Sequence, residues 1–349
     1  MPRYPALARH KIPYEPQNTD HLVKQLIRIA ETRPFLDDDL GSPLEVKLLR
    51  KAKVRAITYS NQIEGNALEE VEVTALLKGK RVAGPAKDIL EIQNYHSALD
   101  YVDQLIEDPR PLQLSDMCDL QRLVTAGTLP EKQSGRIRTV SVSIVNAATH
   151  EKIEDCPEPH ALRELLDDLW KWLEDTKAMN PLIRAFAFHF IAVSIHPFTD
   201  GNGRTVRLMQ HLLLLQDGER LARFVPSETT IMRNRDRYYA VIKRSRTLGK
   251  LDPVIEFLAE CFATSAEEVV EEAKRLLRES AGKTPHARHL KILAHARKKE
   301  KFSMQDVAEW LPDIPRRTLE RDLATLVRKR SLKAAGQLKA RTYSLAKWK

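Results

Sequence analysis

The chain has 349 residues, of which 42% are apolar and 30% are charged, and its formal net charge is +9. This is the composition of a globular protein with room for two or three domains. Three widely scattered cysteines exclude a disulfide framework and a zinc-ligand spacing, and no apolar run reaches the length of a membrane span. The first residues lack the apolar segment of a signal peptide, so we expect a cytoplasmic protein.

An amphipathic helix is predicted in the N-terminal region, which we place at residues 1–110. Its apolar positions recur at three- and four-residue steps between basic side chains: Leu44, Leu48, Leu49, Ala52 and Ala56. Residues 60–66 then read Ser-Asn-Gln-Ile-Glu-Gly-Asn. Glu64 lies beyond the helical run, and Gly65 can supply a left-handed cap. On the residues alone, this sequence could simply end a helix.

The clearest strand signal of the first 280 residues follows a Gly-Arg-Ile-Arg sequence at 135–138. Residues 139–145 alternate apolar and polar side chains, which is the period of a half-exposed strand. We expect a β-hairpin over about residues 139–150. A two-stranded ribbon that only covers the core would give the same pattern.

Residues 196–207 hold the densest set of chemically active side chains. They read His-Pro-Phe-Thr-Asp-Gly-Asn-Gly-Arg-Thr-Val-Arg between two apolar runs, which predicts helix, short loop and helix. A loop that opens a helix presents unpaired N–H groups and the positive end of the helix dipole. Gly201 and Gly203 let a phosphate approach the backbone, while Arg204 and Arg207 lie on one helix face. A tight turn between core helices is the structural alternative.

This segment matches the Fic family signature, HPFx[D/E]GNGRxxR, at every fixed position. The resemblance covers about residues 45–260. It implies a mainly α-helical Fic core at residues 111–280 with a β-hairpin flap. It also implies an enzyme, a protein adenylyltransferase that moves AMP from ATP to a Ser, Thr or Tyr hydroxyl of a target protein or of itself.

The resemblance implies a role for each position of the motif. His196 would be the general base, and Asp200 would hold Mg²⁺ on the nucleotide phosphates. The remaining ATP-binding positions would be Gly201, Asn202, Gly203, Arg204 and Arg207. Tyr239 falls where the family often keeps a tyrosine near the nucleotide, although ordinary packing would explain it as well.

Residues 60–66 resemble the family's inhibitory motif, [S/T]xxxE[G/N]. In the family this glutamate pairs with the second motif arginine, here Glu64 with Arg207, so that ATP binds in an unproductive pose. The flap would hold a target segment as an added strand. Some relatives remove AMP, so a bifunctional enzyme stays open. We also expect a homodimer.

The C-terminal region, residues 284–349, is predicted to be a winged helix-turn-helix domain. It holds 17 lysines and arginines against 6 acidic residues, so the basic excess of the whole chain lies here. An acidic helix over about 252–280 and a linker at 281–285 precede it. Its third helix begins with three exposed basic positions that could contact DNA: Arg316, Arg317 and Arg321. A protein-docking or dimerisation module is the alternative, and a DNA-binding regulator with a nucleotide-sensing Fic domain is the alternative function.

Overall fold

The computed structural model describes residues 2–36, 42–107, 110–145, 152–279, 285–329, 331–336 and 341–346. The fold is mainly helical, which confirms the class expected from the sequence. The chain divides into two compact units, Met1–Asp38 with Val46–Val269, and Asp39–Glu45 with Val270–Lys349. Three predicted segments lie outside the described residues: the flap turn (146–150), most of the linker (281–284) and the tip of the wing (337–340).

Helix α8 (Pro181–Ile195) forms the core of the first unit. Every residue from Leu182 to Ile195 is buried, as expected for a helix that is apolar all round. The Asn180 side chain caps the helix by accepting hydrogen bonds from the first backbone N–H groups. The helix ends at His196, where the backbone turns left-handed with a φ of 51°. This reversal leads the chain into the loop before α9.

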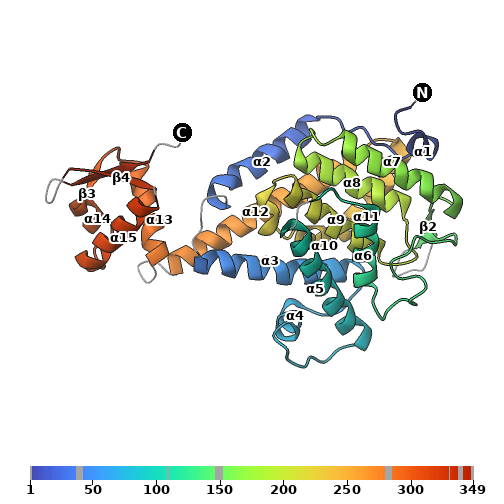
Figure 1. Ribbon diagram of the computed structural model, residues 1–349, viewed down its shortest axis with the longest axis horizontal. Helices are drawn as coiled ribbons and strands as arrows, with labels where there is room; N and C mark the ends of the chain where they lie inside the picture. Colours follow the sequence, from blue (N-terminus) through green and yellow to red (C-terminus); the bar gives the residue numbers. More distant parts are fainter. Residues whose placement is uncertain are drawn as a thin grey trace. The chain divides into compact units, whose positions relative to one another are not determined.

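Helix α9 (Asn202–Gln216) packs against α8, α5 (Ala86–Glu107) and α6 (Leu114–Val124) (Figure 1). The loop between α8 and α9 lies tightly against the end of α6. A Cβ at Gly201, which has a φ of 77°, would come within 2.8 Å of Thr125 Cγ2. Gln121 also donates a hydrogen bond of 2.9 Å to the Asp200 carbonyl. Glycine is therefore required at this close approach.

The remaining helices of the first unit frame this pair. Helix α3 (Ser42–Ile63) carries the predicted apolar stripe, and Leu48, Ala52 and Ile57 are buried. The others are α1 (Pro5–Arg9), α2 (Asp20–Leu36), α4 (Glu70–Leu76), α7 (Leu162–Asp175), α10 (Glu228–Arg233), α11 (Arg235–Leu248) and the first part of α12 (Asp252–Glu279). Among the described residues, no helix combines the length and the apolar character needed to cross a membrane.

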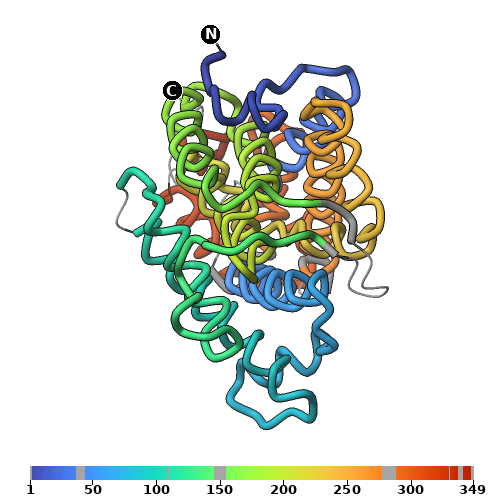
Figure 2. The backbone as a smooth tube through the Cα atoms, turned by 90° about the vertical axis from the view of Figure 1, so that its right-hand side faces the viewer, coloured from blue at the N-terminus to red at the C-terminus, as the bar shows by residue number. Residues whose placement is uncertain are grey.

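The predicted hairpin is present but shorter than its sequence pattern. Strand β1 (Ser143–Val145) pairs antiparallel with β2 (Lys152–Asp155) (Figure 2). Residues 139–142, which alternate like a strand, are irregular. The reason is Arg138, whose guanidinium binds the carbonyls of Val140 at 2.9 Å and Pro157 at 2.5 Å. These contacts curl the backbone before the strand begins.

Beyond the end of α12, the described residues of the second unit form three helices and a small sheet. Its elements are α13 (Pro285–Ala296), β3 (Phe302–Ser303), α14 (Met304–Trp310), α15 (Arg316–Arg328), β4 (Leu332–Ala335) and β5 (Thr342–Leu345). The strands are antiparallel in the order β3-β5-β4, and the sequence had not predicted β3. Ser303 and Asp306 form the expected capping box of α14. This arrangement is compatible with the predicted winged helix.

Candidate active site

One cavity of about 530 Å³ in the first unit brings most of the predicted site residues together. The segment between α8 and α9 supplies one wall, and Glu64, Tyr238 and Tyr239 come from other parts of the chain. Ser143 and Ile144 of the flap strand also line it. The motif residues in the wall are His196, Asp200, Gly201, Asn202, Gly203 and Arg207.

His196 lies in the cavity wall at the end of α8. Burial lowers the pKa of its imidazole to about 4. The ring is therefore neutral at physiological pH and able to accept a proton. Arg138 fixes the backbone here, because its Nε donates to the His196 carbonyl at 2.8 Å and its N–H to the Pro197 carbonyl at 3.0 Å. The predicted Gly-Arg-Ile-Arg element thus holds the end of α8 in place.

The Asn202 side chain holds the motif loop closed. Its Oδ1 accepts a hydrogen bond from the Phe198 N–H at 2.9 Å, and its Nδ2 donates to the Phe198 carbonyl at 2.8 Å. Phe198 itself is fully buried. The resemblance placed Asn202 around the phosphates, but its amide is already used within the loop. Its backbone N–H, in the first turn of α9, remains available to an anion.

Glu64 and Arg207 form an ion pair across the cavity. Arg207 donates from NH2 to Glu64 Oε1 at 2.8 Å, and the Arg207 side chain is 1% exposed. Ser60 holds the same guanidinium through its hydroxyl and its carbonyl, each at 2.8 Å. Burial alone would raise the pKa of the Glu64 carboxyl, but Arg207 and Arg204 keep it below its usual value. The carboxylate is therefore ionised.

The Glu64 carboxylate also lies against the N-terminus of α9. A Cβ at Gly203 would collide with Glu64 Oε1. The carboxylate thus occupies the place where a helix N-terminus accepts an anion. In this structure the anion site of the loop is filled by the chain itself.

Arg204 is buried behind the cavity, whereas Asp200 lines it. The Arg204 side chain is 3% exposed, and its NH1 lies 3.2 Å from Glu91 on α5. The Asp200 side chain is 52% exposed and lines the cavity. One outward carboxylate fits Mg²⁺, which takes few protein ligands when phosphate oxygens and water supply the rest. No group of three His, Cys, Asp or Glu side chains suited to a metal occurs among the described residues.

A buried polar network supports the cavity from behind. His189 bonds to Gln210 at 2.7 Å and to the Tyr238 hydroxyl at 2.8 Å. Burial lowers the pKa of His189 to about 3 and raises that of Glu228 to about 6. His189 is therefore a packed, neutral partner of Tyr238. No metal role is needed to explain it.

Sequence reasoning missed three residues of this site. Ser60 was part of the quoted inhibitory motif, but its contact with Arg207 was not predicted. Glu91 on α5 and Arg235 on α11 are distant in sequence from the motif and belong to no pattern. Charged residues are common throughout the chain, so a charge alone does not identify Glu91 or Arg235 as a site residue.

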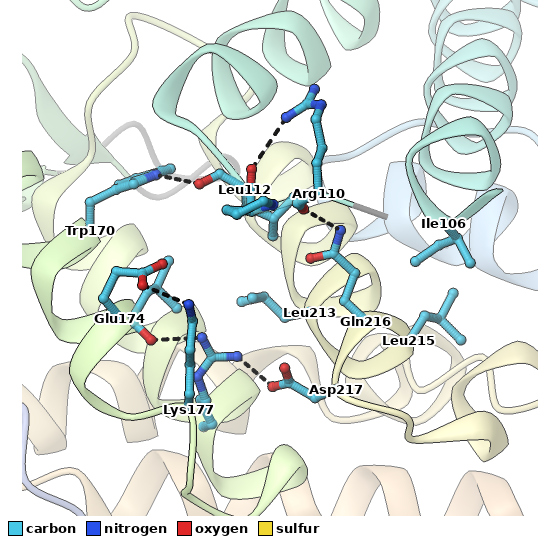
Figure 3. A pocket seen from close by; sticks show the side chains of 13 residues that line it. Ile106, Arg110, Leu112, Trp170, Glu174, Lys177, Leu213, Leu215, Gln216 and Asp217 are labelled. Atoms are coloured by element: carbon cyan, nitrogen blue, oxygen red, sulfur yellow. Dashed lines mark hydrogen bonds and ion pairs between the residues drawn. The ribbon is translucent and has the colours of Figure 1, made fainter. Parts of the chain in front are cut away.

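A second cavity of about 540 Å³ lies at the other end of α9, between α7 and the start of α6 (Figure 3). Each basic side chain in its wall forms an ion pair with a carboxylate. The pairs are Lys177 with Glu174 at 2.6 Å, Arg184 with Asp217 at 2.5 Å, and Arg110 with Asp116 at 2.6 Å. None of the predicted site residues lines this cavity. It therefore offers little uncompensated charge for a ligand.

The comparison with known proteins agrees with the geometry of the first cavity. Residues 111–214, which include the whole motif, match the sequence model of the Fic/DOC family. The chain carries a Fic domain. Protein adenylyltransferase Fic of Nematostella vectensis is 30% identical over 247 residues, which cover 68% of this chain and 54% of that protein. Protein adenylyltransferase fic-1 of Caenorhabditis elegans is 27% identical over 268 residues, or 71% and 50% of the two chains.

Solved structures share the fold. A Fic family protein from Desulfovibrio desulfuricans superimposes with a TM-score of 0.66 at 26% identity, covering 95% of this chain and 98% of that one. Fic-1 from Caenorhabditis elegans superimposes with a TM-score of 0.61, also at 26% identity, covering 73% of each chain. The chain spans about half the length of the curated relatives it matches.

Proposed function

We propose that the protein is a Mg²⁺-dependent protein adenylyltransferase that is held inactive by Glu64. The observation that carries this proposal is the cavity itself, in which His196, Asp200 and the α9 N-terminus surround a space closed by the Glu64–Arg207 pair. The adenylyltransferase names of the curated relatives support the same reaction class.

In the proposed reaction, a hydroxyl of the target attacks the α-phosphorus of ATP. The new O–P bond forms as the bond to pyrophosphate breaks, and the neutral His196 imidazole takes the hydroxyl proton. The backbone N–H groups at Gly201 to Gly203 and the Arg207 guanidinium would stabilise the leaving pyrophosphate. Mg²⁺, held by Asp200, would neutralise phosphate charge.

The flap strand would present the target. Ser143 and Ile144 line the cavity, so a segment added to β1 would bring its hydroxyl close to His196. The proposal covers Ser, Thr and Tyr hydroxyls, of a target or of the protein itself. Glu64 could also orient water on an AMP–target bond, so removal of AMP is a possible second activity.

The decisive experiment incubates purified E64G protein, with and without H196A, with Mg²⁺ and ATP labelled either on the α- or on the γ-phosphate. We expect label on protein only from the α-position, and none with H196A. H211A is the matched control, because His211 lies on α9, the helix that follows the motif loop, but does not line the cavity. Transfer of γ-label, or equal labelling by H196A, would reject adenylylation.

A regulator that binds DNA is the second candidate. Arg316, Arg317 and Arg321 are all exposed at the start of α15, the position of a recognition helix. Specific DNA binding that weakens steeply with salt, without label transfer by any variant, would favour this candidate. The homodimer and the cytoplasmic location remain predictions from the sequence.

A further inference from the structure

A third arginine belongs to the cavity although it lies outside the Fic motif. Arg235 is the first residue of α11 and lines the cavity together with Arg207. Its guanidinium carbon lies 5.7 Å from the centroid of the Tyr239 ring. This places a cation on the α11 side of the space, whereas the motif arginines come from α9.

Arg235 interacts with the Tyr239 hydroxyl and, through its charge, with Glu64, but its guanidinium is not fully hydrogen-bonded. Among the residues that the structure describes, no carboxylate forms an ion pair with it, and its buried Nε has no hydrogen-bond partner. Neighbouring arginines of the surface are paired: Arg233 with Glu268 at 2.5 Å and Arg237 with Glu260 at 2.7 Å. Arg235 differs from both, and a buried donor without a partner is costly unless a ligand supplies one.

The cavity holds more donors of this kind. The NH1 group of Arg207 is also buried and unpartnered in the described structure, although its NH2 and Nε are bound. Arg235 acts on the same carboxylate, since it contributes to the low pKa of Glu64 together with Arg207 and Arg204. When Glu64 leaves, two arginines from two helices face one space without an anion. A polyphosphate satisfies both.

We propose that Arg235 is a third nucleotide-binding arginine, which holds the triphosphate from the α11 side once Glu64 has left Arg207. This inference rests on the proposed function, because it takes ATP as the ligand. Arg235 would lower the dissociation constant of the triphosphate. The residue would thus favour ligands with a full phosphate chain over AMP or adenosine.

The test measures binding of Mg²⁺-ATP and of adenosine by calorimetry to full-length protein carrying E64G, with and without R235Q. We expect R235Q to weaken ATP binding about 10-fold, the effect of losing a charge-assisted hydrogen bond, and to leave adenosine binding unchanged. R235K should fall between the two. R237Q is the matched control, two residues along the same helix and paired on the surface, and should change ATP binding less than about 2-fold.

Three outcomes would overturn the inference. Equal ATP affinity of E64G and E64G/R235Q shows that Arg235 does not hold the nucleotide. An equal loss for ATP and adenosine assigns its effect to the packing of Tyr239. If R235Q weakens ATP binding in the wild-type background, measured in parallel, but not in E64G, its effect is assigned to the Glu64 carboxylate. If E64G itself binds no ATP while its thermal unfolding is normal, the proposed function fails first, and Arg235 with it.

Discussion

The two cavities at the ends of α9 are similar in volume but opposite in electrostatics. In the cavity of Figure 3, Lys177, Arg184 and Arg110 each lie within 2.8 Å of a carboxylate. In the cavity at the motif, no carboxylate of the described residues forms an ion pair with Arg235, and Arg207 pairs with Glu64. Hollow space alone is thus a poor guide to function. A cation in a cavity wall that has no carboxylate partner marks the place where an external anion is expected.

The difference between the two cavities predicts that the ion pairs of the cavity in Figure 3 contribute to the stability of the fold. In D217A the buried Arg184 guanidinium, 5% exposed, loses its carboxylate. We expect a loss of about 3 kcal/mol in the free energy of unfolding, because a buried charge is left alone. Urea unfolding measures this, and ATP affinity of the folded variant should not change. A variant of normal stability would show that the pair in this cavity is dispensable.

The motif cavity should lose its shape when the Asn202 side chain no longer holds its loop. N202A removes the two hydrogen bonds to the buried backbone of Phe198. We expect a loss of about 2 kcal/mol in stability, since both groups would be buried without partners. Unlike D217A, this variant should also lose ATP binding, which calorimetry can follow. Retained ATP binding would mean that the loop keeps its shape without Asn202.

Buried histidines near the motif cavity predict the pH dependence. Burial lowers the folded-state pKa of His196 to about 4 and that of His189 to about 3, below the unfolded value of about 6.5. The unfolded chain therefore binds more protons between these values, so stability is highest above pH 6.5 and falls as the pH drops towards 4. We expect about 1 kcal/mol per pH unit for each histidine. H189Q should reduce the slope of stability against pH, and an unchanged slope would contradict a buried neutral His189.

The smallest effect is expected for an exposed ion pair at the cavity of Figure 3. Lys177 and Glu174 are 60% and 58% exposed, so their ion pair is screened by water. K177A should change stability by less than about 0.5 kcal/mol and leave label transfer unchanged. A clear loss of transfer in K177A would show that this cavity takes part in the reaction. The two cavities would then not differ in function.

The sequence predicted the parts of the site that are local in the chain. The helix-loop-helix at the motif follows from apolar runs around Gly201 and Gly203, and the stripe of α3 follows from its 3.6-residue period. The pairing of Glu64 with Arg207 came from resemblance to a family, because no local rule joins residues 143 positions apart in the sequence.

The sequence pattern was less informative where tertiary contacts decide the outcome. The alternation at residues 139–142 predicts a strand, but Arg138 uses the carbonyl of Val140 and bends the backbone. Glu91 and Arg235 reach the site only through the packing of α5 and α11 around α9. The side chain of Asn202 bonds to the Phe198 backbone within the same loop, and a sequence motif does not show this orientation.

We propose that Glu64 fills the anion site at the start of α9 and thereby restrains the enzyme. The most direct measurement compares transfer of α-labelled AMP by the wild type, E64G and E64G/H196A at equal concentration. We expect several-fold higher transfer by E64G than by the wild type, and none by the double variant. Unchanged or lower transfer by E64G, with its thermal unfolding intact, would contradict it.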